Sequence, residues 1–185
     1  YVICTNALTV SSVRTSTDTI TWASTATLPV SRLWNGVYFA NGLFVLIAND
    51  GVTTSADGLT WSSFITLTSG TNYRRGAYGA GVHVVIGNGT KAVSSVDGVI
   101  WTPHTVADQN LSAVAYGLGA AKFVAVGETF GVQQGMKSTD GLTWTTLLPP
   151  VATKTWNNIA FGANTNRFVS LARGDCSTTN KGAYL

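Results

Sequence analysis

The chain has 185 residues, of which 45% are hydrophobic and only 10% are charged, with a formal net charge of +3. This composition provides a sizeable core and a neutral, hydroxyl-rich surface. The basic residues are scattered singly apart from Arg74 and Arg75, so the sequence excludes a nucleic-acid groove, which needs a clustered basic stripe. No apolar run approaches the roughly eighteen residues of a membrane span, and no signal peptide is visible, so we expect no membrane insertion.

The first expected element is a strand over residues 1–5, which matches the second strand of a unit that recurs along the chain. Because Tyr1 falls inside this strand, we expect the sequence to be a processed or truncated piece. The next element is a heptad that ends in Trp and occurs four times, with 39, 40 and 43 residues between successive Trp positions. Its shared positions are Ser16, Asp18 and Trp22; Ser55, Asp57, Gly58 and Trp61; Ser95, Asp97, Gly98 and Trp101; and Ser138, Asp140, Gly141 and Trp144.

Two further markers follow each heptad in a fixed order. The first is an aromatic residue before Ala or Gly, and the second is an aromatic residue or His that leads an apolar run. The pairs are Phe39 and Phe44, Tyr78 and His83, Tyr116 and Phe123, and Phe161 and Phe168. Together the markers define repeat units at about 1–22 (partial), 23–61, 62–101, 102–144 and 145–185 (partial), which we assign to one domain over residues 1–185.

Within each unit, short β-branched and aromatic runs alternate with Gly, Asn and Asp, and no stretch has helical periodicity. In the best-defined unit we expect strands over residues 111–117, 122–127, 132–138 and 143–148. Four strands in about forty residues are typical of a propeller blade. The sequence therefore predicts an all-β fold, a β-propeller of four-stranded antiparallel blades, with about 4.5 blades present from a ring of five to eight.

Each heptad is expected to form the turn between the third and fourth strands of a blade. Asp and Ser side chains accept backbone N–H groups, and Gly supplies a positive φ, so the chain can reverse tightly. The Trp that follows is expected to begin the outer strand and to pack between blades. This assigns the heptad residues to the stability of the fold.

The heptads resemble the Asp-box, the Ser-x-Asp-x-Gly-x-Thr-Trp turn of sialidases and of many non-enzymatic propellers. The version here is one residue shorter, as in Ser55-Ala-Asp57-Gly58-Leu-Thr-Trp61, and the first copy has Thr19 in place of Gly. The whole pattern is similar to repeats of secreted bacterial proteins and of bacteriophage tail-fibre or other virion proteins. The resemblance implies a propeller fold and leaves the activity open.

Sequence positions that vary between units are candidates for ligand binding, because function on a repeat scaffold is carried by its variable positions. Aromatic, amide and guanidinium groups precede the first strands of three units and are expected to bind a sugar: Trp34, Asn35, Tyr73, Arg74, Arg75, Trp156 and Asn157. The alternative for Trp34 and Trp156 is a place in the core between blades.

The sequence offers no catalytic, metal or cofactor site. The carboxylates outside the heptads include Asp50 and Glu128, which follow equivalent strands and could share a rim, but solvated loop residues are the simpler interpretation. His83 replaces an aromatic core residue, and His104 is expected in a connecting loop. Cys4 and Cys176 lie near opposite ends and form no metal motif, although a disulfide between them is a hypothesis.

The function predicted from these observations is non-enzymatic attachment to a host surface, by an extracellular or virion-borne protein of the tail-fibre type. Its expected partners are a host-surface glycan or receptor and other virion or surface proteins, with trimerisation through regions outside this sequence. Two alternatives stay open. One is a sialidase-like glycoside hydrolase whose catalytic residues lie elsewhere, and the other is a bacterial propeller that serves as an assembly scaffold.

Overall fold

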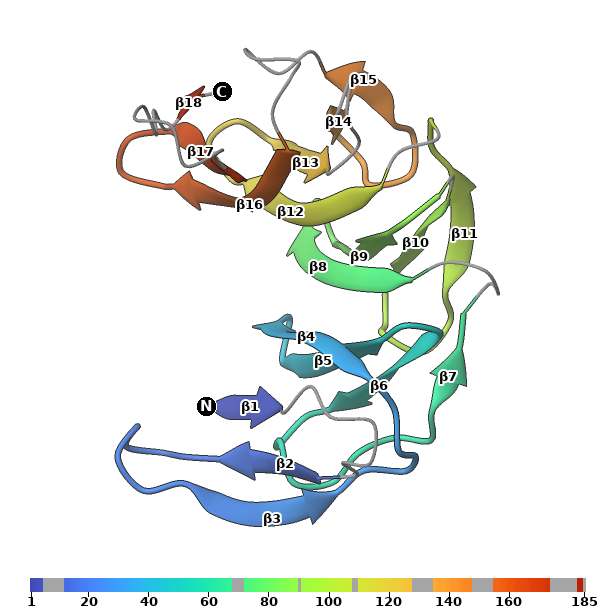
Figure 1. Cartoon of the computed structure of the whole chain (residues 1–185), viewed down its shortest axis with the longest axis vertical. Coiled ribbons are helices and arrows are strands. Elements are labelled where there is room, and N and C mark those ends of the chain that lie inside the picture. The colour runs from blue at the N-terminus through green and yellow to red at the C-terminus, as the bar shows by residue number, and fades with distance from the viewer. Residues whose placement is uncertain are drawn as a thin grey trace.

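The structure, a computed structural model, describes residues 1–4, 12–67, 72–89, 91–107, 110–127, 135–147, 155–173 and 183–184. These residues contain eighteen strands and no helix, arranged as five antiparallel sheets of three or four strands. We number the sheets as blades 1 to 5 in chain order. They follow one another around an open arc, with β4, β8, β12 and β16 on its concave side (Figure 1). The predicted all-β propeller architecture is confirmed.

The strands of each blade are consecutive in the chain. Blade 1 comprises β1 (Val2–Cys4), β2 (Ser12–Thr15) and β3 (Ala23–Thr27). Blade 2 comprises β4 (Trp34–Ala40), β5 (Leu43–Ala48), β6 (Gly51–Ser55) and β7 (Ile65–Thr66). Blade 3 comprises β8 (Tyr73–Gly79), β9 (Val82–Gly87), β10 (Lys91–Ser95) and β11 (Thr102–Thr105). Blade 4 comprises β12 (Leu111–Gly117), β13 (Lys122–Gly127), β14 (Gly135–Ser138) and β15 (Thr145–Leu147). Blade 5 comprises β16 (Thr155–Gly162), β17 (Arg167–Arg173) and β18 (Ala183–Tyr184).

The aromatic markers of the repeat are cross-strand partners on the two inner strands of a blade. Phe39 pairs with Phe44, and the equivalent pairs are Tyr78 with His83, Tyr116 with Phe123, and Phe161 with Phe168. Their ring centroids lie 4.6 to 4.9 Å apart. Because such pairs stabilise an antiparallel register, these residues fix how the first two strands align.

The core lies between the blades. Each of four clusters of buried apolar side chains draws on two neighbouring sheets. One of them joins Ile86 of β9 to Phe123 of β13 and includes the half-buried Trp144. A single sheet could not bury both of its faces, so each blade depends on its neighbours for stability.

The heptad turns have the hydrogen bonds expected of them. In blade 2, Ser55 Oγ accepts the Gly58 N–H at 2.8 Å, and Asp57 Oδ1 accepts the N–H groups of Leu59 and Thr60 at 2.8 Å each. The Trp61 indole donates to the Gly58 carbonyl at 3.2 Å. The other three copies repeat these bonds. A shared hydrogen-bond set explains why these positions recur in the sequence.

Glycine is favoured at this turn position for two reasons, although the first copy has Thr19 there with a φ of 66°. Gly58, Gly98 and Gly141 have φ between 74° and 76°, the left-handed region that side chains disfavour. A Cβ on Gly98 would lie 2.9 Å from Leu43 Cδ1, and one on Gly141 would lie 2.8 Å from Val84 Cγ2, both in the preceding blade. The turn therefore fixes the chain reversal and the distance between blades together.

One sequence expectation for the outer strands needs correction. The Trp of the turn precedes the outer strand instead of beginning it, as β15 begins at Thr145, because the Trp144 indole is still bonded within the turn. The strand expected over residues 132–138 coincides with β14 from Gly135 onward, and residues 128–134 lie outside the described part of the chain.

Candidate functional site: the inner-strand rim

Each of the strands β4, β8, β12 and β16 contains a bulge near its beginning. The pairing register shifts between Trp34 and Gly36, Tyr73 and Arg75, Leu111 and Ala113, and Trp156 and Asn158. The extra residues are Asn35, Arg74, Ser112 and Asn157. We call these four residues, together with the residues that follow them (Gly36, Arg75, Ala113 and Asn158), the inner-strand rim. The bulges place different side chains at one equivalent position of four blades.

The residues that precede the bulges are part of the core. Trp34, Tyr73 and Trp156 are 1%, 0% and 2% exposed. Trp34 packs edge-on against Phe64 with a centroid distance of 6.1 Å, in the cluster between blades 1 and 2. The prediction that these three rings form a sugar-binding platform is therefore wrong, because rings so deeply buried cannot stack on a ligand. The alternative that placed Trp34 and Trp156 in the core is confirmed.

Two bulged side chains bond neighbouring blades to each other. Asn35 Nδ2 donates to the Tyr73 carbonyl at 2.6 Å and to Asn49 Oδ1 at 2.6 Å. In the same way, Ser112 Oγ donates to the Trp156 carbonyl at 2.5 Å. The bonds to the Tyr73 and Trp156 carbonyls each reach the first strand of the next blade. Asn35 and Ser112 therefore have a structural role at the rim.

The remaining polar groups of the rim are accessible. Arg75 and Asn157 are exposed, and so is Asn158, whose Oδ1 accepts the Ile159 N–H at 2.9 Å. Arg74 is half-buried. The Arg75 guanidinium lies across the boundary between blades and donates through Nη1 to the carbonyls of Asn35 and Arg74. The rim thus presents hydrogen-bond donors from blades 3 and 5. Asn158, which directly follows the predicted Asn157, adds a second exposed amide to those of the predicted set.

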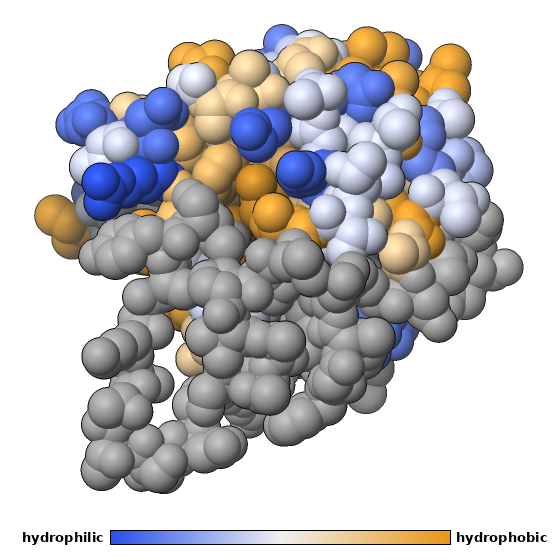
Figure 2. Space-filling view, turned by 90° about the horizontal axis from the view of Figure 1, so that it is seen from above, coloured by the Kyte–Doolittle hydropathy of each residue, from blue (hydrophilic) through white to orange (hydrophobic). Residues whose placement is uncertain are grey.

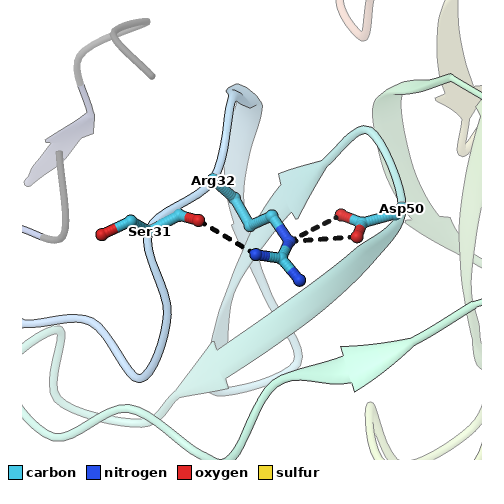
Figure 3. Close-up of polar contacts among 3 residues, drawn as sticks. All are labelled: Ser31, Arg32 and Asp50. Carbon is cyan, nitrogen blue, oxygen red and sulfur yellow. Dashed lines mark hydrogen bonds and ion pairs between the residues drawn. The ribbon is translucent and has the colours of Figure 1, made fainter. Parts of the chain in front are cut away.

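The carboxylate pair considered for hydrolysis is only partly described. Asp50 accepts hydrogen bonds from Arg32 Nε at 3.0 and 3.2 Å, and Arg32 also donates to the Ser31 carbonyl (Figure 3). The Arg32 guanidinium stacks over Phe64, 5.2 Å from the ring centroid. Glu128 lies outside the described residues, and so does Cys176, which leaves the hypothetical disulfide with Cys4 a prediction.

The turn carboxylates are held in their ionised form. Backbone N–H groups of Thr60 and Leu59, together with the Ser55 hydroxyl, lower the pKa of Asp57 to about 2. The equivalent groups lower the pKa of Asp18 to about 2 and also depress the pKa values of Asp97 and Asp140. A carboxylate that stays ionised at neutral pH cannot serve as a general acid, and the bonds support the structural role predicted for the four Asp residues.

The two histidines have structural environments. His83 is fully buried, its Nδ1 is 3.1 Å from Tyr38 Oη in blade 2, and burial lowers its pKa. It occupies the core position expected of it. His104 lies in β11, paired with Ala92, and not in the predicted loop. Its Nε2 is 2.7 Å from Ser94 Oγ, so a hydrogen bond within the sheet accounts for its place there.

Exposed aliphatic residues lie in the heptad turns, at the end of the blade opposite the inner-strand rim. The residue after the turn glycine position is aliphatic in every copy, and Ile20, Leu59, Val99 and Leu142 are 84%, 52%, 59% and 43% exposed. The repeat signals this, since the fifth heptad position is always aliphatic. An edge-on view shows hydrophilic and hydrophobic residues interspersed over the described surface (Figure 2).

Two pockets formed by described residues lie away from the rim. A pocket of about 330 Å³ lies between blades 1 and 2 and is lined by Tyr1, Phe44 and Asp57, among others. A second, of about 260 Å³, is lined by Lys122, Lys137 and neighbouring hydroxyl groups of blade 4. Neither includes a rim residue. The described residues contain no His, Cys, Asp and Glu group suited to a metal ion. They also include no helix with the length and apolar character to cross a membrane.

Comparison with known proteins supports the fold. No family model and no curated protein matches the sequence. A catalytically inactive virginiamycin B lyase from Staphylococcus aureus with quinupristin has a TM-score of 0.73 and 13% identity, covering 97% of this chain and 63% of its own. The YCF48 protein bound to a D1 peptide has a TM-score of 0.63 and 19% sequence identity. The match covers 95% of this chain and 61% of the YCF48 chain. A chain of a nidogen/laminin complex has a TM-score of 0.66 and 11% sequence identity. The match covers 89% of this chain and 68% of that one.

The chain therefore spans about 63% of the length of the virginiamycin B lyase that it resembles. The names of these three structures describe a lyase, a protein complex and a peptide complex, and identities of 11 to 19% carry no function across. What they share with this chain is the arrangement of its sheets. The chain has the fold of part of a β-propeller.

Proposed function

We propose that this chain is a non-catalytic recognition module, part of an extracellular or virion-borne adhesin of the tail-fibre type that binds a host-surface glycan. One observation carries the proposal. The same bulge recurs in four blades on a constant scaffold, yet its sequence differs in each, and the side chains left exposed at or after it are Arg75, Asn157 and Asn158. A scaffold position that keeps its geometry and varies its chemistry is where a propeller can build specificity.

A glycan fits the chemistry of the accessible rim groups. The amides of Asn157 and Asn158 in blade 5 and the guanidinium of Arg75 in blade 3 offer several exposed hydrogen-bond donors. Sugar hydroxyls and carboxylates are suitable acceptors for such donors. The contact would depend on hydrogen bonds and charge, since the nearby aromatic rings are buried.

The environment of the carboxylates supports a role without catalysis. Four of the Asp residues bond their own turns, and Asp50 is paired with Arg32. Hydrolysis of a glycoside needs two carboxyl groups that are free to face the scissile bond. A hydrolase would have to supply them from outside the described residues.

The test is an array of bacterial surface glycans, with released sugar measured in the same wells. We expect binding without release. The double variant Asn157→Ala, Asn158→Ala should weaken binding at least about threefold through lost hydrogen bonds. The control is Asn164→Ala, which changes an exposed residue beyond the far end of β16 and should leave binding unchanged. Sugar release, or no binding to any glycan, would refute the proposal.

A second candidate is an assembly scaffold that binds a polypeptide. Two of the similar structures are named as complexes with a peptide or a protein, and the buried aromatic rings remove the stacking surface that many sugar sites use. A peptide array, screened with the same variants, distinguishes this candidate: selective peptide binding without glycan binding would favour the scaffold.

A further inference from the structure

Arg75 differs from its equivalents in the other blades. The corresponding residues are Gly36, Ala113 and Asn158, which are all uncharged. The fold therefore accepts a small or neutral side chain at this position, and nothing in the bulge requires an arginine. The positive charge of Arg75 is a property of blade 3 alone.

The Arg75 guanidinium is held in place by the backbone. Its Nη1 donates to the Asn35 carbonyl in blade 2 and to the Arg74 carbonyl at 2.9 Å. Gly36 permits this arrangement, because a Cβ there would lie 2.8 Å from the Arg74 carbonyl oxygen and 3.4 Å from Arg75 Nη1. Residues from two blades thus orient a side chain that would otherwise have considerable rotamer freedom.

No carboxylate of the described residues neutralises Arg75. The ion pair found in that part of the chain joins Arg32 to Asp50. The hydrogen bonds of Arg75 use only its Nη1, so its Nε and Nη2 donors have no hydrogen bond among the described residues, and the residue is exposed. Two parallel N–H groups of a guanidinium match the two oxygens of a carboxylate.

From this geometry, and resting on the proposed function, we propose that Arg75 binds a sugar carboxylate and that the recognised glycan is acidic. The exposed amides of Asn157 and Asn158 lie on the same rim, two blades away, and would bond hydroxyl groups of neighbouring sugar units. The ligand class is a glycan with carboxylated sugars, and its charge gives the recognition a dependence on salt.

The experiment uses the full chain on an array of bacterial surface glycans, each printed in its native and its carboxyl-reduced form. Glutamate-rich peptides are printed beside them. We expect binding to carboxylated glycans, lost on carboxyl reduction. Arg75→Gln should bind these glycans at least about tenfold more weakly, since it removes a charge-assisted bond. Arg75→Lys, which keeps the charge without the planar fork, should fall between the two.

Arg32→Gln is the control, because Arg32 is a half-buried arginine already paired with a carboxylate. It should change binding less than twofold, and thermal melting verifies that each variant is folded. Binding to neutral glycans that Arg75→Gln does not affect would overturn the inference and leave the proposed function intact. Preference for the acidic peptides would overturn the glycan ligand. If no glycan bound in either form, the proposed function would fail, and the inference with it.

Discussion

At the residue scale, His83 is the most unusual member of the repeat, because it places a titratable ring where three other blades have Phe. The ring is fully buried between Tyr78 and Trp101, and its Nε2 has no hydrogen-bond partner among the described residues. Burial lowers the pKa of His83 below its ordinary value of 6.5, and the Asp97 carboxylate offsets part of this effect.

The double variant His83→Phe, Tyr38→Phe should stabilise the fold by about 1 to 2 kcal/mol at pH 5, since it removes the buried, unpaired His83 Nε2 and both partners of the bond between His83 Nδ1 and Tyr38 Oη. In the natural chain the pKa of His83 is higher in the unfolded state than in the folded state, so the unfolded state takes up a proton at a higher pH. The free energy of unfolding therefore falls as the pH drops below about 6.5, and this group does not change it above that pH. The variant should show a shallower fall. Part of the fall remains, because burial also lowers the pKa of His104. Denaturant unfolding at pH 8 and pH 5 measures both effects, and an unchanged slope would contradict the prediction.

At the element scale, the heptad turn does more than reverse the chain. Gly141 and Gly81 both have a positive φ, of 75° and 80°. A Cβ on Gly141 would approach Val84, Val82 and Phe123, whereas a Cβ on Gly81 would have no atom within 4 Å. Substitutions at these two glycines therefore measure the cost of backbone strain separately from the cost of overpacking between blades.

Gly81→Ala should cost about 1 kcal/mol, the strain of a left-handed alanine alone. Gly141→Ala should cost about 3 kcal/mol, because overpacking against blade 3 is added to that strain. Denaturant unfolding of the two variants gives the comparison. Equal losses would show that the turn does not set the contact between blades.

The elements also show how far the sequence could be interpreted. The strands and turns were predictable, because heptads with identical spacing repeat the same local hydrogen bonds. The burial of Tyr73 was not predicted, and that of Trp34 and Trp156 was one of two alternatives, since strand residues alternate between faces and a bulge of one residue reverses the alternation. Leu111, which holds the equivalent position in blade 4, was the signal that this is a core position. The cross-blade bond of Asn35 depends on tertiary contact and has no local pattern.

At the scale of the whole molecule, the blades are joined by bonds between inner strands as well as by the core. Ser112 is 6% exposed and donates to the Val126 carbonyl in its own blade and to the Trp156 carbonyl in blade 5. Blade 5 rests against blade 4 through this bond and one apolar cluster. Loosening of the bond should therefore affect blade 5 more than the others.

Ser112→Ala should cost about 1 to 3 kcal/mol, because it leaves the Trp156 carbonyl buried without its donor. Native-state hydrogen exchange should become faster in β16 and β17 and stay unchanged in β4 to β6, since stability in such arrays is passed between neighbours. Asn35→Ala is the reciprocal control and should accelerate exchange at the boundary of blades 2 and 3. A uniform increase over all blades would contradict this division.

The inner-strand rim also has a consequence for how the sequence of such a protein can evolve. Positions 75, 157 and 158 are exposed, while the residues that support them are buried or bonded within the framework. Substitutions there can redirect specificity at little cost in folding, in the way that an antibody alters its loops and keeps its framework. A library randomised at these three positions should yield folded members in high proportion, which would make the blade arc a ready scaffold for selecting new binders.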